Sequence, residues 1–239
     1  MHTILCYGDS NTFGTNPNGG RWDFAERWTG VLSALLGPSV HLIEEGLGGR
    51  TTVFSDPLED MRCGKEYLPL VLHSHRPLDL VILSLGTNDC KSFFHANERI
   101  IAKALMQLGQ LVRMYPYGQG YPIPRVLVMA PIYIGEAIEN TQYVEFDGSS
   151  VSLSRKLGPA IKELAEQEGF LFFDASTVAS ASQTDQLHMD KDGHRALGEA
   201  LAPVIRSLFG LQPETRVVEV AQEPAKPVHR TLRFPFLKR

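Results

Sequence analysis

The sequence predicts an α/β fold of three layers, in which helices cover both faces of a five-stranded parallel sheet. Five short apolar runs alternate along the chain with segments that repeat apolar residues at helical spacing. Two of the runs, LVILSL and VLVMA, are almost entirely apolar, as expected for strands that are covered on both faces. With 239 residues, of which 43% are hydrophobic and 21% charged, the chain is long enough to bury one substantial core.

The strands are expected where the apolar runs are short and end at glycine or small polar residues. They are residues 3–7, 40–44, 79–85, 125–130 and 170–174. The helices are expected between them, where apolar residues return every three or four positions. They are residues 27–36, 100–112, 154–168 and 192–208, and Gly169 is a suitable C-terminal stop for the third.

Two regions depart from this alternation. Residues 46–65 form a long connection with several glycines and aspartates, and connections of this length are often functional. Within it, Arg50 is expected to pair with Asp56 or Glu45. Residues 1–210 are expected to form the folded domain. Residues 211–239, rich in proline and basic side chains, are expected to be an extended tail or a segment that docks on a partner.

The bulk composition excludes several function classes. A net charge of −4 gives no reason to expect a nucleic acid or an anionic membrane as a partner. Three cysteines without CxxC spacing indicate reduced thiols and a cytoplasmic protein. The first residues have neither a basic segment nor a long apolar stretch, so no signal peptide is expected. No apolar run reaches the roughly 20 residues that span a bilayer.

Small polar residues and glycines follow four of the five expected strands. They are GDSN at residues 8–11, GLGGRT at 46–51, GTND at 86–89 and, after a short connection, DQLH at 185–188. The carboxyl ends of parallel strands meet at one edge of the sheet, where ligands of such folds bind. Each block alone is more often a turn than a site, but together they predict a site at this edge.

The blocks supply complementary chemistry for nucleophilic catalysis. Ser10 has a hydroxyl that needs a base before it can attack. His188 can be that base, and Asp185, three residues earlier, can orient the imidazole. The backbone N–H groups of Ser10 and Gly49 and the side-chain amide of Asn88 can bind an oxyanion.

These blocks resemble the four consensus blocks of the SGNH (GDSL-type) hydrolases. Longer segments, such as IEEGLGGRTT at 43–52 and HRPLDLVILSLGTNDCKSFF at 75–94, resemble the bacterial arylesterase and acyltransferase (perhydrolase) branch. The resemblance implies a flavodoxin-like sheet, hydrolysis of small or aryl esters through an acyl-enzyme, acyl transfer to alcohols or peroxide, and assembly into a homo-oligomer. It implies no cofactor and no metal.

The chain departs from that branch beside the nucleophile. Asn11 stands where the branch usually has Leu, Phe13 where it has Trp, and Gly49 where it has a small residue such as Ala. We expect the substrate pocket to be formed by six residues near the four blocks: Asn11, Phe13, Thr87, Phe93, Ile132 and Tyr133.

Other functions fit the sequence less well. GLGGRTT lacks the third glycine of a dinucleotide-binding turn and follows the second strand rather than the first. His73 and His75 are two residues apart on an expected helix, so they point in different directions and a shared metal is not expected. Carbohydrate deacetylation, thioester hydrolysis and weakly active ligand binding stay open as alternatives on the same site.

Overall fold

The computed structural model describes residues 1–212. Its centre is one sheet of five parallel strands in the order β2-β1-β3-β4-β5. The strands are β1 (His2–Gly8), β2 (Val40–Gly46), β3 (Leu80–Ser84), β4 (Arg125–Ala130) and β5 (Leu171–Asp174). All five lie at the expected places, which confirms the predicted fold class. The expected extension at 211–239 lies outside the described residues except for its first two.

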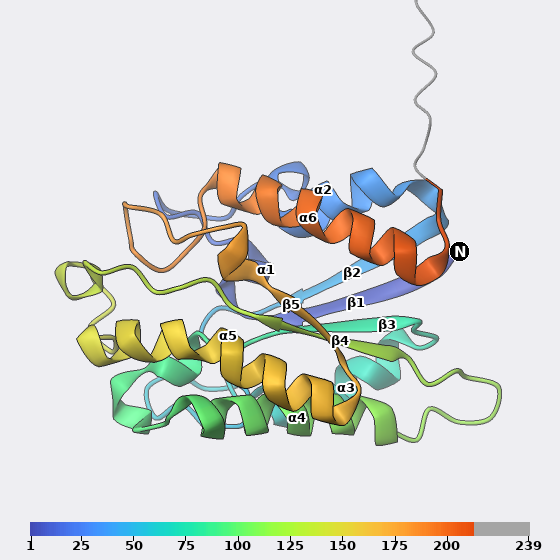
Figure 1. The fold of residues 1–239 in the computed structure, drawn as a ribbon, viewed down its shortest axis with the longest axis horizontal. Helices are drawn as coiled ribbons and strands as arrows, with labels where there is room; N and C mark the ends of the chain where they lie inside the picture. The colour runs from blue at the N-terminus through green and yellow to red at the C-terminus, as the bar shows by residue number, and fades with distance from the viewer. Residues whose placement is uncertain (213–239) are drawn as a thin grey trace, which may run out of the picture.

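Helices cover both faces of the sheet, so the molecule has three layers (Figure 1). Helices α2 (Trp28–Leu36) and α6 (Lys191–Phe209) pack together on one face. Helices α3 (Gly64–His75), α4 (Glu98–Met114) and α5 (Gly148–Glu168) lie on the other. A single short turn of helix, α1 (Ser10–Phe13), follows β1 directly. Within residues 1–212, no helix is both long and apolar enough to cross a bilayer.

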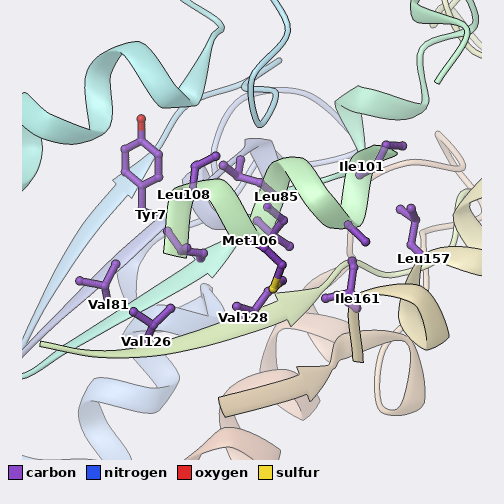
Figure 2. Packing of buried hydrophobic residues seen from close by; sticks show 14 of the residues in the cluster. Tyr7, Val81, Leu85, Ile101, Met106, Leu108, Val126, Val128, Leu157 and Ile161 are labelled. Atoms are coloured by element: carbon purple, nitrogen blue, oxygen red, sulfur yellow. The ribbon is translucent and has the colours of Figure 1, made fainter. Parts of the chain in front are cut away.

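The core is divided into two layers by the sheet, because successive strand residues face opposite sides. In β1, Leu5 and Tyr7 belong to the layer under α3, α4 and α5, whereas Ile4 and Cys6 belong to the layer under α2 and α6. Figure 2 shows part of the first layer, in which Tyr7 and side chains of β3 and β4 lie near those of α4 and α5. This double burial explains why the central strands read as continuous apolar runs.

Helix α5 begins six residues before the expected position of 154. Asp147 caps it by accepting hydrogen bonds from the N–H groups of Ser149 and Ser150, and the Asp147 N–H donates to the Ser150 hydroxyl. The first turn is polar, so its start depends on this reciprocal cap rather than on apolar periodicity. The apolar pattern alone therefore locates the packed part of a helix better than its first turn.

Candidate active site

Ser10 is held at the carboxyl end of strand β1, next to the middle strand of the sheet. Asp9 caps the short helix α1 by accepting the Asn11 N–H at 2.9 Å, which fixes the turn that carries Ser10. Gly8 is required just before it, because a Cβ there would lie 2.1 Å from the Thr12 hydroxyl oxygen. The turn is thus formed by its own sequence, and Ser10 is 7% exposed at the surface of a cavity.

Asp185 and His188 form a buried carboxylate–imidazole pair. Asp185 Oδ2 lies 2.7 Å from His188 Nδ1, and Asp185 Oδ1 accepts the backbone N–H groups of Leu187 and His188, each at 3.0 Å. Burial pushes the pKa of Asp185 up, but these hydrogen bonds outweigh it and hold the pKa below its ordinary value. Asp185 is therefore ionised, and it orients the imidazole with Nε2 free for another partner.

Three further histidines, His194, His73 and His75, do not belong to this carboxylate–imidazole pair. His194 lies on α6, is completely buried, and accepts the backbone N–H of Trp28 at Nδ1. Burial lowers the pKa of His194 to about 4, so it is neutral near pH 7. On α3, His73 contacts the Tyr115 hydroxyl and His75 contacts the Glu45 carboxylate. In the described part of the chain, no group of three or more His, Cys, Asp and Glu side chains is placed to hold a metal ion.

Asn11 connects the serine turn to the histidine turn. Its Oδ1 accepts the Met189 N–H at 2.9 Å, and its Nδ2 donates to the Leu187 carbonyl at 3.4 Å. The residues bonded to Asn11 flank His188 on both sides. Asn11 therefore joins the turn of Ser10 to the turn of His188, and its side chain does not line the cavity that Ser10 and His188 share.

Gly49 and Asn88 lie on two neighbouring connections, one after β2 and one after β3. The Asn88 amide donates one of its two N–H groups to the Arg50 carbonyl at 3.1 Å, so the two connections are directly bonded. Thr52 adds a second link, since its N–H donates to the buried Asp89 carboxylate at 3.1 Å. The two expected oxyanion donors are thereby held next to each other.

Arg50 does not form the expected ion pair with Asp56 or the Glu45 carboxylate. Its Nη1 instead donates to two backbone carbonyls, those of Gly8, at 2.8 Å, and of Glu45. The guanidinium also lies 4.0 Å from the centre of the Tyr7 ring. Arg50 therefore links the ends of β1 and β2, where a flat multidentate donor can reach backbone carbonyls of both strands.

A cavity of about 410 Å³ joins these groups at the carboxyl edge of the sheet. One part of its wall is apolar or aromatic and another part is charged. The apolar part includes Phe13, Leu47, Tyr143, Phe146 and Leu187; the charged part consists of Glu59, Arg62, Lys91 and Glu145; and Ser10, Gly49, Asn88 and His188 lie in the same lining. The five connections that follow the five strands each contribute to it.

Of the six expected pocket residues, only Phe13 lines this cavity. Thr87 and Ile132 face a separate, nearly closed space behind Asp9. Phe93 packs edge-on against Phe94, and the Tyr133 ring lies under the Arg155 guanidinium. These four side chains, like that of Asn11, do not line the cavity, because proximity to a motif in sequence does not determine which way a side chain turns.

The cavity residues that the sequence reasoning missed are the charged ones and Tyr143. Lys91 comes three residues after Asn88, and Glu59 and Arg62 lie in the long connection 46–65 that had been singled out for its length. Charged side chains in a loop usually indicate a solvated surface, so no sequence pattern marked them. Tyr143 and Glu145 lie between β4 and α5, where no motif was recognised.

A parallel α/β sandwich that brings a serine, the histidine of a histidine–aspartate pair and two expected oxyanion donors to one cavity is typical of serine ester hydrolases. The chain belongs to the GDSL-like lipase/acylhydrolase family, whose model matches residues 6–196. It is therefore an esterase of the acylhydrolase type, as the resemblance implied.

Two solved structures illustrate the relationship. The native M. smegmatis aryl esterase is 38% identical, with a TM-score of 0.83 over 87% of this chain and 100% of that one. A carbohydrate acetylesterase family member from Sinorhizobium meliloti is also 38% identical, with a TM-score of 0.82 over 88% of this chain and 100% of that one. The comparison with curated proteins found no relative.

Proposed function

We propose that this esterase cleaves small esters by a double displacement in which Ser10 is the nucleophile. The contact that carries the proposal is the 2.7 Å pair of His188 Nδ1 and Asp185 Oδ2 in the cavity that Ser10 also lines. Because Nδ1 keeps its hydrogen and donates it in a hydrogen bond to the carboxylate, Nε2 is left with a lone pair. That nitrogen takes the Ser10 proton as Oγ bonds to the ester carbonyl carbon.

The carbonyl electrons move onto oxygen, and the resulting anion needs preorganised donors. The N–H groups of Ser10 and Gly49 and the free N–H of the Asn88 amide supply them. His188 then protonates the leaving alkoxide, the C–O bond breaks, and an acyl-serine remains. Water, deprotonated by His188, attacks the acyl-serine and releases the carboxylic acid and Ser10. Asp185 stays ionised and stabilises the imidazolium in both halves of the cycle.

The test is Ser10→Ala, assayed on p-nitrophenyl acetate and by labelling with a fluorophosphonate. We expect hydrolysis to fall by at least about 10³-fold and labelling to vanish. Ser74→Ala is the matched control, because Ser74 is exposed on α3 and its hydroxyl only bonds the Leu70 carbonyl. Full activity in Ser10→Ala would overturn the mechanism, and an unlabelled wild type would favour a ligand-binding protein instead.

Acyl transfer is the second activity that we propose. Any alcohol that enters the cavity in place of water can attack the acyl-serine, and the apolar part of the wall favours such an acceptor over water. Hydrolysis of p-nitrophenyl acetate with added benzyl alcohol should then yield benzyl acetate. Acetic acid as the sole product over the accessible range of alcohol concentrations would limit the enzyme to hydrolysis.

Carbohydrate acetates are the second candidate substrate class. The charged wall of Glu59, Arg62, Lys91 and Glu145 offers donors and acceptors that suit hydroxyl groups better than a hydrocarbon chain. The S. meliloti relative is described as a carbohydrate acetylesterase family member. A comparison of kcat/KM for glucose pentaacetate and phenyl acetate would decide between the classes.

A homo-oligomer is also part of the proposal. Light scattering on the purified protein that finds only a monomer would refute it.

A further inference from the structure

Tyr143 reaches the histidine–aspartate pair from a connection that carries none of the four sequence blocks. It lies between β4 and α5, and its hydroxyl oxygen is 3.4 Å from His188 Nδ1. The two rings meet edge to face, with centroids 5.5 Å apart and an angle of 70° between their planes. Tyr143 also lines the cavity, and its ring packs directly against His188.

The Tyr143 hydroxyl contacts a nitrogen that is already a hydrogen-bond donor, so the carboxylate is the acceptor that its own hydrogen can use. The Nδ1–H of His188 already donates its hydrogen bond to Asp185 Oδ2 at 2.7 Å. The Asp185 carboxylate accepts this hydrogen bond and those from the backbone N–H groups of Leu187 and His188, and a carboxylate has about four acceptor positions. One position is therefore open to the phenol. Burial, followed by the charges of Asp185 and Glu145, raises the pKa of Tyr143, so the hydroxyl keeps its proton.

The connection that carries Tyr143 is fastened to the turn that carries the pair. Gln186, between Asp185 and His188, has a left-handed backbone with φ of 62°. Its carbonyl accepts the Gly135 N–H at 2.7 Å, and its side-chain Oε1 accepts the Ala137 N–H at 3.3 Å. The same connection carries Gly135, Ala137 and Tyr143. Its hydrogen bonds to Gln186 therefore hold this connection against the turn of Asp185 and His188.

We propose that Tyr143 is a positioning residue for ester hydrolysis. It holds His188 in place, and it weakens the ion pair between His188 and Asp185 by donating a hydrogen bond to the Asp185 carboxylate. The proposal rests on the proposed function, because it needs His188 as the general base. The hydroxyl takes up part of the carboxylate's negative charge. Without it, Asp185 attracts the imidazolium more strongly, and His188 stays protonated and inactive to a higher pH.

Other charged or titratable groups surround His188 and must be kept constant in a test. Asp9 lies behind the serine turn, and His194 approaches from α6; both sense the charge of His188. Glu59, Arg62, Lys91 and Glu145 line the same cavity. Replacing Tyr143 by Phe removes one oxygen atom and leaves all of these groups in place, so a change in the pH profile reports on the hydroxyl.

The experiment compares Tyr143→Phe with Tyr133→Phe across the pH range, using p-nitrophenyl acetate. Tyr133 is the matched control, because it lies on the same connection and packs under Arg155 outside the cavity. For Tyr143→Phe we expect kcat to fall about 3- to 10-fold with little change in KM. The midpoint of the acid limb of kcat/KM should move to higher pH by about half a unit to one unit. Tyr133→Phe should match the wild type.

An acid limb that coincides for Tyr143→Phe and the wild type would overturn the proposal, whatever the rate. If Tyr143→Leu lost activity while Tyr143→Phe kept both rate and profile, Tyr143 would be only a wall of the cavity, and the proposal would be wrong. These results are separable from failure of the proposed function, which would appear as full activity of Ser10→Ala.

Discussion

Lys91 Nζ lies 2.7 Å from Asp56 Oδ2, and the two side chains are 3% and 0% exposed. This ion pair joins the connection after β2 to the one after β3, three residues beyond Asn88. Glu59 and Glu145 approach the same ammonium group at 3.5 and 3.8 Å. Burial pushes the pKa of Asp56 up, but the hydrogen bond from Lys91 and two backbone N–H groups hold it below its ordinary value. Lys91 thus links the connections that follow β2, β3 and β4 on one side of the cavity.

Replacing Lys91 by Met should strongly destabilise the protein, because it removes the cation that neutralises the buried Asp56 carboxylate. The expected loss is about 3–5 kcal/mol in the free energy of unfolding, measured by urea denaturation. Arg195→Ala is the control, since Arg195 and Asp192 form an exposed pair on α6, expected to contribute about 0–1 kcal/mol. Equal losses of unfolding free energy in the two variants would show that the Lys91–Asp56 pair stabilises the fold no more than an exposed pair does.

Asn88→Ala should lower kcat on p-nitrophenyl acetate by about 10²–10³-fold, because it removes one donor to the oxyanion. Its loss also frees the Arg50 carbonyl, so the folded fraction is to be checked by circular dichroism. Asn97→Ala is the matched control, because Asn97 caps α4 by accepting the Ile100 N–H at 3.0 Å. That variant should lose about 1 kcal/mol of stability without a change in kcat. Similar kcat values for both variants would remove Asn88 from the oxyanion hole.

Gly49→Ala should impair activity more than Gly48→Ala. Gly49 has φ of 74°, a left-handed conformation, and a Cβ there would lie 2.6 Å from Glu59 Oε2 and 2.8 Å from Arg62 Nε. The backbone conformation alone costs alanine about 1 kcal/mol. A Cβ at Gly48 meets nothing within 4 Å, so that variant controls for the loss of a glycine in the same loop.

The effect of the contact with the Glu59–Arg62 ion pair can be separated from that of the backbone strain at Gly49. If crowding of Arg62 displaces the Gly49 N–H, adding Arg62→Ala to Gly49→Ala should recover part of kcat on p-nitrophenyl acetate. No recovery would assign the loss to the left-handed backbone. A Gly49→Ala enzyme as active as wild type would show that neither the contact nor the strain reaches the oxyanion donor.

Asp9 gives a prediction about stability and pH. Burial raises its pKa from 3.8 to about 6, against the hydrogen bond from Asn11 and the influence of His188. A raised carboxyl pKa means that the folded state binds the proton more tightly than the unfolded state. The contribution of Asp9 to stability is therefore fully present below pH 3.8 and is lost as pH rises through about 6.

Asp9→Asn should consequently become more stable than the wild type as pH rises from 4 to 8, by up to about 3 kcal/mol. Urea denaturation at several pH values measures the difference. Asp147→Asn is the control with the opposite sign. Hydrogen bonding, first from the Ser149 hydroxyl, lowers the pKa of Asp147, so its contribution is lost as pH falls. Parallel pH trends for the two variants would contradict the assignment.

The prediction from sequence was accurate where a feature is encoded locally. Strand β4 has the expected bounds, and the other strands differ by one or two residues at their ends. The pairing of Asp185 with His188 could be predicted because they lie three positions apart in one turn. Family membership followed in the same way, from four short blocks whose residues serve one reaction.

The sequence by itself determined the α/β architecture, the order of its elements and the residues that we propose as nucleophile, base and oxyanion donors. Strand and helix periodicity and turn chemistry act over a few residues, so they can be read along the chain. Only the tertiary structure decided what surrounds those residues. It turned Asn11 inward, placed Ile132 and Tyr133 outside the cavity, and brought Lys91, Arg62 and Tyr143 into its lining. Those walls come from five separate connections, and the direction of each side chain depends on partners that are distant in sequence.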